Sequence, residues 1–136
     1  MRIITLNANG IRAAARKQFF DWLPTQDADV VCLQETRAQP EQRKAPEFSP
    51  EGYQTYYVDA ERKGYSGVAI YSRREPDRVI EGLGWKAFDR EGRWVQADYG
   101  RLSVVSVYMP SGTSGDERQD FKYRIMKKMK PLLKGF

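Results

Sequence analysis

Two short apolar segments that each end abruptly in polar residues constrain the fold of this chain most strongly. The first covers roughly residues 2–7 and leads into Asn7 and Asn9, and the second covers Val30–Gln34 and stops before Glu35. Apolar runs of this length predict buried strands, and in α/β proteins the ends of such strands line the crevice where ligands bind. The pattern therefore predicts an α/β fold that presents reactive side chains at the rim of a sheet.

The side chains at these strand ends offer amide and carboxylate groups as ligands. Asn7, Asn9 and Glu35 supply only oxygen and nitrogen atoms, with no thiolate and no imidazole. This set favours a hard cation such as Mg²⁺ and a phosphate substrate. Two simpler interpretations stay open: an ion pair between Glu35 and a neighbouring arginine, and a turn stabilised by the two asparagines.

The composition excludes several classes of active site. The chain has 136 residues and no histidine, which excludes every mechanism that uses an imidazole within this chain. Its single cysteine, Cys32, lies in the second apolar run, so neither a disulfide framework nor an ordinary catalytic zinc site is expected. No apolar stretch reaches membrane-spanning length and the N-terminus does not resemble a signal peptide, so we expect a cytoplasmic protein with no membrane partner.

The net charge of +5 favours a polyanionic partner. Most of the excess positive charge lies after residue 115, where the chain has seven Lys and Arg residues and three Asp and Glu residues. A solvated cationic helix face explains this charge equally well. Charge by itself therefore does not establish binding to nucleic acid.

The order of the expected elements predicts a single domain over residues 1–136, with one mixed sheet and flanking helices. A helix follows the first strand and ends at Pro24, and an amphipathic helix covers roughly residues 116–134, where Pro131 should weaken the last turn. Further strands, expected to pair as antiparallel neighbours, are Tyr53–Val58, Gly67–Ser72, Arg93–Tyr99 and Leu102–Tyr108.

Five motifs follow one another along the chain in a recognisable order. They are Leu-Asn-Ala-Asn-Gly-Ile-Arg (6–12), Leu-Gln-Glu-Thr (33–36), Gly-Tyr-Ser-Gly-Val-Ala (64–69), Asp-Arg-Glu-Gly-Arg (89–93) and Tyr-Met-Pro-Ser-Gly (108–112), and a later Lys-Tyr-Arg (122–124) also fits. The set resembles the exonuclease III family of abasic-site endonucleases, within the endonuclease/exonuclease/phosphatase superfamily. The first and third motifs point to its DNA-repair branch.

The resemblance implies roles for residues at the strand ends. Asn7 and Glu35 would hold Mg²⁺ or Mn²⁺, Asn9 would support that site, and Tyr108 would be the active-site tyrosine at the scissile phosphate. The implied reaction is attack of a metal-assisted water on the phosphodiester 5′ to an abasic site, with removal of 3′-terminal nucleotides as a second activity.

The resemblance also implies contacts with duplex DNA that carries abasic sites or 3′ ends. Arg12, Ala13 and Tyr65 fall in segments expected to be loops that grip the DNA around the lesion. From the residues alone, the favoured interpretation of Tyr65 is an exposed aromatic at the tip of a simple hairpin. The functional interpretation is a side chain that enters a groove of the duplex.

The resemblance covers this chain but only about the N-terminal half of the family's DNase I-like two-sheet sandwich. The Gly-Asp-x-Asn and Ser-Asp-His motifs, which supply the residue that activates water and further metal ligands, do not occur here. We therefore expect one sheet of the sandwich, an inactive isolated chain, and an inner face covered by a C-terminal half or another copy. The alternatives are a catalytically silent DNA-binding module and a phosphoesterase acting on other substrates such as phosphoinositides.

Overall fold

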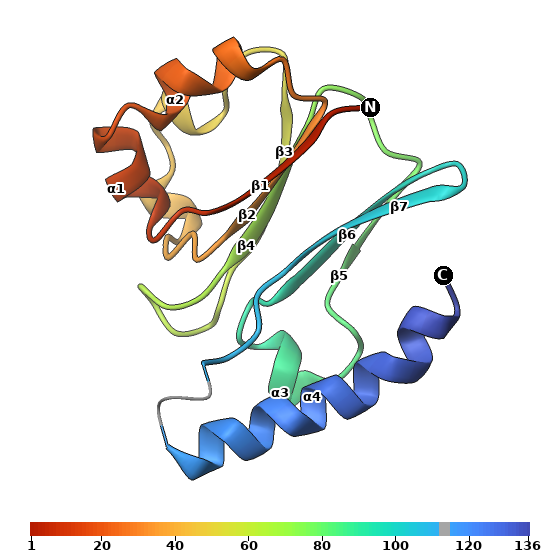
Figure 1. Cartoon of the computed structure of the whole chain (residues 1–136). Coiled ribbons are helices and arrows are strands. Elements are labelled where there is room, and N and C mark those ends of the chain that lie inside the picture. The colour runs from red at the N-terminus through yellow and green to blue at the C-terminus, as the bar shows by residue number, and fades with distance from the viewer. Residues whose placement is uncertain (112–114) are drawn as a thin grey trace.

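The strands of this chain form two sheets that pack face to face, as the computed structural model, which describes residues 1–111 and 115–136, shows in Figure 1. The first sheet has four strands in the order β1-β2-β4-β3. β1 and β2 are parallel, whereas β4 is antiparallel to both of its neighbours. The bounds of these strands are β1 Ile3–Asn7, β2 Val30–Gln34, β3 Gln54–Val58 and β4 Val68–Ser72.

The second sheet has three antiparallel strands in the order β5-β6-β7. Its strands are β5 Arg78–Glu81, β6 Trp94–Tyr99 and β7 Leu102–Val107. Both β6 and β7 lie over β4 of the first sheet, and β7 also lies over β2. This stacking brings the end of β7 close to the end of β2.

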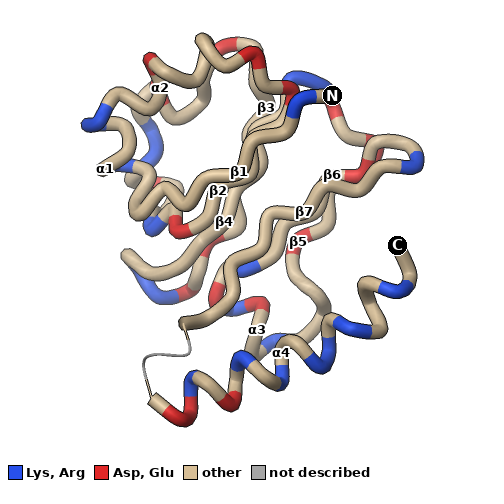
Figure 2. The backbone as a smooth tube through the Cα atoms, in the orientation of Figure 1, with Lys and Arg blue, Asp and Glu red and all other residues tan. Residues whose placement is uncertain are grey.

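Helices cover the outer face of each sheet, so the layers run helix, sheet, sheet, helix (Figure 1). The segments are α1 Ile11–Arg16, α2 Phe19–Trp22, α3 Lys86–Asp89 and α4 Asp116–Lys134, with 3₁₀ turns at Leu23–Gln26, Pro40–Gln42 and Pro46–Phe48. Figure 2 shows Lys and Arg residues spread along α4. In the part of the chain that the structure describes, no helix combines the length and the apolar character that crossing a membrane requires.

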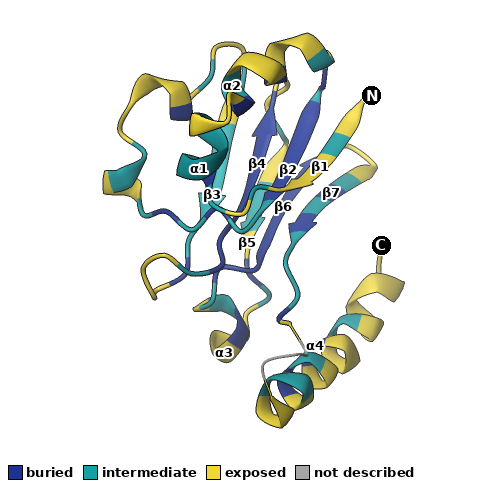
Figure 3. Cartoon of the chain, turned by 60° about the vertical axis from the view of Figure 1, so that its left-hand side comes forward, coloured by how far each residue is buried: buried dark blue, intermediate teal, exposed yellow. Residues whose placement is uncertain are grey.

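Alternation along the strands explains how one strand contributes to two cores. On β2, Val31 and Leu33 pack with the α1 and α2 side chains, while Val30 and Cys32 face the second sheet. The inter-sheet core is completed by apolar residues of β4, β6 and β7. Figure 3 shows β2, β4 and β6 as the most buried strands, whereas β7 is largely intermediate. Both faces of β2 are therefore buried, as its continuous apolar run predicts.

The α/β class and the mixed sheet are confirmed, but the expectation of one sheet needs correction. Strands after residue 75 form a second sheet, because both faces of the first sheet are apolar and β6 and β7 cover the face that α1 and α2 leave free. The inner face at β2 and β4 thus needs neither a C-terminal half nor another copy to bury it. Among the described residues, edge strands stay open on this side: Ile3 of β1 is 45% exposed and Leu102 of β7 is 42% exposed.

The helices agree with the sequence in part. The C-terminal helix has the predicted bounds, Asp116–Lys134, and it continues through Pro131. The first helix is divided in two, because Gln18 adopts a left-handed backbone (φ 67°) between α1 and α2. Strand β5 has no counterpart among the expected elements.

Candidate functional site

The ends of β1 and β2 lie side by side, as expected for parallel neighbours. Asn7 is in register with Gln34, and the ladder continues past the strands with hydrogen bonds from the backbone N–H groups of Ala8 and Gly10 to the carbonyls of Gln34 and Glu35. This register places the Asn7 amide next to the Glu35 carboxylate, and Asn7 Nδ2 donates a hydrogen bond to Glu35 Oε1 at 2.9 Å. The predicted meeting of these two strand ends is confirmed.

Glu35 lies at the centre of the candidate site. Its carboxylate also forms an ion pair with Arg37, and its side chain is only 14% exposed. Burial alone would raise the pKa of Glu35, but hydrogen bonds with Asn7, Tyr108 and Arg37, together with the Arg37 charge, bring that pKa below its ordinary value. Glu35 is therefore an ionised carboxylate at neutral pH, as a metal ligand must be.

Both of the simpler interpretations of these residues are present in the structure as well. Glu35 does pair with a neighbouring arginine, Arg37. Asn7 Oδ1 accepts a hydrogen bond from the backbone N–H of Asn9 at 2.9 Å, which is a local asparagine turn. The exposed Asn9 thus meets Asn7 through its main chain, so it shapes the turn that orients the Asn7 side chain.

Tyr108 reaches this rim from the other sheet. It follows β7, which is held against β2 by a hydrogen bond from Ser106 Oγ to the Leu33 carbonyl at 2.9 Å and another from Gln34 Nε2 to Ser106 Oγ at 3.1 Å. Burial, with a hydrogen bond to the Glu35 carboxylate, raises the pKa of the Tyr108 phenol. Glu35 and Tyr108, which are 73 residues apart in the sequence, therefore lie together at one rim. The motif that begins at Tyr108 ends at Gly112, which lies outside the described residues.

Arg12 and Ala13 belong to a helix and not to a loop, which corrects the expectation for this segment. Both lie within α1, where three consecutive alanines favour helix. Arg12 Nη2 donates to the backbone carbonyl of Arg37 at 3.2 Å, which ties α1 to the segment that follows Glu35. Arg12 is half-buried and reaches the rim through its long side chain, whereas Ala13 offers only its backbone and a methyl group.

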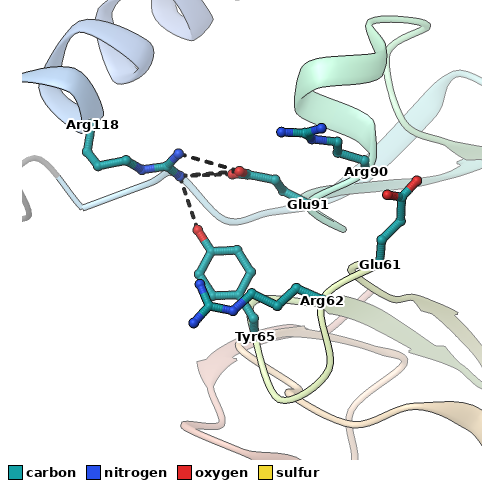
Figure 4. A pocket seen from close by; sticks show the side chains of 6 residues that line it. All are labelled: Glu61, Arg62, Tyr65, Arg90, Glu91 and Arg118. Carbon is teal, nitrogen blue, oxygen red and sulfur yellow. Dashed lines mark hydrogen bonds and ion pairs between the residues drawn. The ribbon is translucent and has the colours of Figure 1, made fainter.

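Tyr65 lies in the loop between the antiparallel strands β3 and β4. It is half-buried, so the exposed position that the residues alone favoured is wrong. Its hydroxyl accepts hydrogen bonds from Arg93 Nη2 at 2.9 Å and from Arg118 Nη2 at 3.1 Å, the second of which is drawn in Figure 4. The Arg62 guanidinium lies 5.1 Å from the centre of its ring. A pocket beside the Glu35 rim is lined by Glu35, Arg37, Tyr65, Arg93, Tyr108 and Arg118, among others.

Backbone geometry singles out the same region. Among the non-glycine residues with positive φ are Asn9 (47°), Glu35 (52°), Arg37 (52°) and Ser66 (51°). Such conformations cost of order 1–3 kcal/mol each and gather at functional sites, where the surrounding structure holds them in place. Four of the six such residues in the described part of the chain lie at or next to the rim around Glu35 and Tyr65, whereas Gln18 and Asp27 lie elsewhere. This rim is therefore the strongest candidate site among the described residues.

Three charged residues of this region were not selected from the sequence. Arg93, Glu91 and Arg118 form a cluster in which Glu91 Oε1 accepts from Arg93 Nε and from Arg118 Nη2, both at 2.9 Å. Arg93 is 1% exposed. The only sequence sign concerned Arg93, which stands at the start of the strand predicted over Arg93–Tyr99, within a motif that looked like a charged turn.

The donor set fits part of a site for a hard cation. Mg²⁺ keeps several waters and takes one or two protein carboxylates, so an ionised Glu35 beside the Asn7 amide suits it. In the described part of the chain, no group of three or more His, Cys, Asp or Glu side chains is placed to hold a metal ion. Glu35 and Asn7 would therefore supply one side of the coordination shell.

Comparison with known proteins gives consistent matches along the chain. Residues 4–130 match the Endonuclease/Exonuclease/phosphatase family. The exodeoxyribonuclease of Bacillus subtilis (strain 168) is 42% identical over 123 residues, which cover 90% of this chain and 48% of that protein. The DNA repair nuclease APEX1 of Danio rerio is 36% identical, over 90% of this chain and 40% of that protein.

Solved structures agree with this result. The Xenopus laevis APE2 catalytic domain superposes with a TM-score of 0.79 at 31% identity, over 91% of this chain and 50% of that one. An AP endonuclease from Archaeoglobus fulgidus superposes with a TM-score of 0.78 at 29% identity, over 93% of this chain and 48% of that one. The chain thus spans half or less of the length of these relatives. The predicted resemblance is confirmed: the chain belongs to the endonuclease/exonuclease/phosphatase family, and its relatives include an exodeoxyribonuclease and AP endonucleases.

Proposed function

We propose that this chain forms one part of a Mg²⁺-dependent DNA-repair nuclease, which hydrolyses the phosphodiester 5′ to abasic sites or removes nucleotides from 3′ ends. The observation that carries the proposal is the cluster of Asn7, Glu35 and Tyr108 at one rim, which joins the ends of β1, β2 and β7. The family membership and the nuclease relatives support it.

Glu35 and Asn7 would hold the metal, and Mn²⁺ would suit the same donors. Bound there, the ion would neutralise charge on the phosphoryl oxygens. Glu35 is ionised at neutral pH because its pKa is lowered. The Asn7 amide keeps the Glu35 carboxylate oriented, and the Asn9 backbone keeps Asn7 oriented in turn. A fixed carboxylate needs little rearrangement when it meets a cation.

Tyr108 would act on the scissile phosphate. Its pKa is raised by burial and by the nearby Glu35 carboxylate, so the phenol keeps its proton at neutral pH. A protonated phenol donates a hydrogen bond and therefore stabilises charge that develops on a phosphoryl oxygen. The placement of Tyr108 beside Glu35 lets both groups serve the same phosphate.

Arg12, Ala13 and Tyr65 would contact the DNA on either side of this phosphate. Arg12 extends from α1 toward the segment after Glu35, and Tyr65 borders the pocket that also contains Tyr108. Contacts between arginine and the DNA backbone release counterions, so affinity should fall as salt rises.

The isolated chain should be inactive on DNA. The residues that activate water in the family, within its Gly-Asp-x-Asn and Ser-Asp-His motifs, do not occur in this sequence. We infer that a C-terminal half completes the site and lies along the open edges of β1 and β7, where Ile3 and Leu102 are exposed. The length that the chain shares with its relatives supports this inference.

A catalytically silent DNA-binding module is the second candidate. The observation that favours it is the ion pair of Glu35 with Arg37, because this cation already neutralises the carboxylate. This module would bind duplex DNA through Arg12, Tyr65 and the basic helix α4 without cleaving it.

The test is incision of a duplex that carries one abasic site, in the presence of Mg²⁺. The chain is assayed alone and together with the separately expressed C-terminal portion of the Bacillus subtilis exodeoxyribonuclease. We expect incision only by the pair, loss of incision with EDTA, and a loss of about 100-fold or more in Glu35→Gln. Glu51→Gln, at an exposed position outside the site, is the matched control and should incise normally.

Each outcome decides between the candidates. Incision by the chain alone would contradict the expected inactivity. A pair that assembles but does not incise would count against the nuclease. Salt-dependent binding without incision would favour the binding module.

A further inference from the structure

Arg93 makes contacts that reach well beyond its own strand. It is the first residue before β6, and its side chain is 1% exposed. A guanidinium presents its N–H donors in a rigid fork, and each of its three nitrogens here donates to a different residue at 2.9 Å: Nε to Glu91, Nη1 to the backbone carbonyl of Tyr108, and Nη2 to the hydroxyl of Tyr65. One buried side chain therefore joins two tyrosines of the candidate site.

The link to Tyr108 is made twice. The backbone N–H of Tyr108 donates to the Arg93 carbonyl at 2.9 Å, while the Arg93 guanidinium donates to the Tyr108 carbonyl. The guanidinium carbon lies 5.1 Å from the centre of the Tyr108 ring and 5.7 Å from that of Tyr65. The main chain at Tyr108 and the positions of both rings thus depend on the same group.

The link to Tyr65 is reinforced from α4. Arg118 donates to the Tyr65 hydroxyl and to Glu91, and Figure 4 shows these three side chains converging. Glu91 in turn accepts from Arg93, which closes a network over three separate segments. The phenol oxygen of Tyr65 accepts from two arginines, so its ring has little freedom to turn.

Stability alone is a poor reason for such a buried cation. Removing a guanidinium from water is costly, and an apolar side chain of similar size often stabilises a core equally well. A rigid three-way donor instead sets the distances between the groups that it joins. The geometry therefore suits a residue that positions others.

We propose that Arg93 is a positioning residue that holds Tyr65 and Tyr108 in one fixed arrangement, so that the DNA contact and the phosphate contact engage the same strand together. The inference rests on the proposed function for the roles of the two tyrosines. The physical coupling between them through Arg93 does not depend on that function and is tested separately.

The experiment places 3-fluorotyrosine at position 108 alone and records its ¹⁹F resonance. The resonance is compared in four forms of the chain: unaltered, Tyr65→Phe, Arg93→Met and the double variant. Tyr65→Phe removes the hydroxyl that Arg93 Nη2 donates to. We expect Tyr65→Phe to shift the Tyr108 resonance when Arg93 is present and to cause no further shift when Arg93 is Met.

Arg43→Met is the matched control. The side chain of Arg43 is also buried, with 8% of it exposed. Its Nη1 and Nη2 donate to the Asp59 carboxylate at 2.9 and 3.0 Å, and its guanidinium packs over the Tyr57 ring. The Arg43→Met variant should be destabilised as Arg93→Met is, but its Tyr108 resonance should not shift. If Arg93→Met does not fold, Arg93→Lys replaces it in the cycle, since lysine keeps the charge but loses the fork.

Three results would overturn the proposal. The first is no shift of the Tyr108 resonance in Tyr65→Phe. The second is a Tyr65→Phe shift of equal size with and without Arg93. The third is a shift in Arg43→Met as large as that in Arg93→Met. In the reconstituted enzyme, Arg93→Met should also lower kcat/KM for abasic-site incision at least about tenfold, compared with Arg43→Met. If the coupling is seen but the pair does not incise, the nuclease assignment fails and the positioning role of Arg93 stands.

Discussion

Gly92 offers a sharp test of how the two sheets meet. Its φ is +59°, and a Cβ added there would lie 2.5 Å from the backbone N of Ala60, 2.6 Å from the carbonyl carbon of Asp59 and 2.9 Å from the carbonyl oxygen of Val58. These are main-chain atoms at the end of β3 and just after it, so they cannot move aside as the end of a flexible side chain would. Gly92→Ala should therefore force the two segments apart.

Gly100 is a matched control because it has nearly the same backbone conformation. Its φ is +61°, and a Cβ there would meet nothing within 4 Å. Gly100→Ala should cost about 1 kcal/mol in free energy of unfolding, from the left-handed backbone alone. Gly92→Ala carries this cost and a further 2 kcal/mol or so from the overlap, about 3 kcal/mol in total.

The measurement is urea unfolding of the two variants and the unaltered chain. With a slope of about 2 kcal/mol per molar, the extra overlap should lower the midpoint of Gly92→Ala by about 1 M relative to Gly100→Ala. Equal midpoints would refute the close approach. The displacement of the main chain at Gly92 should also reach the candidate site at Tyr65. The Gly92 carbonyl accepts hydrogen bonds from the Gly67 backbone N–H at 3.0 Å and from Ser66 Oγ at 3.3 Å, and these two residues directly follow Tyr65 in the chain.

Two further predictions concern packing and charge. Ile125→Ala should lower the free energy of unfolding by about 2–4 kcal/mol, because Ile125 is the fully buried residue on the inner face of α4. Met126→Ala, at a 51% exposed position of the same helix, should cost less than about 0.5 kcal/mol. Equal losses in urea unfolding would contradict the packing of α4. Burial alone would raise the pKa of Glu91, but hydrogen bonds from Arg118 and Arg93 bring that pKa below its ordinary value. The stability that ionised Glu91 contributes is therefore present above its unfolded-state pKa and is lost as pH falls through its folded-state pKa. Glu91→Gln should therefore flatten the decline in unfolding free energy between about pH 5 and pH 3, and parallel pH profiles for the two proteins would argue against this.

Elements with a strong periodic signal were predictable from the sequence. β2 was expected at Val30–Gln34 and has those bounds, because four consecutive apolar residues must be buried on both faces. The same holds for α4, where Phe121 and Ile125 repeat at helical spacing and both are buried. β5 escaped detection because Arg78–Glu81 is short and has a charge at each end.

The candidate site was predictable only where it depends on strand ends. Asn7 and Glu35 meet because their strands are parallel neighbours, which the order of the first elements already suggests. Arg93 and Arg118 were not selected because nothing in the sequence relates them to Tyr65, which lies 28 and 53 residues away. Contacts at such separations depend on how two sheets and a helix stack.

The sequence by itself determined the class of the fold, the family and the residue types at the strand ends, because apolar periodicity and short motifs are local properties. The tertiary structure decided that the strands divide into two sheets, that Tyr108 comes to Glu35, and that a buried Arg93 joins Tyr65 to Tyr108. The physical reason is that strand patterns specify which faces need burial but not which partner buries them. That choice is made by packing the whole chain at once.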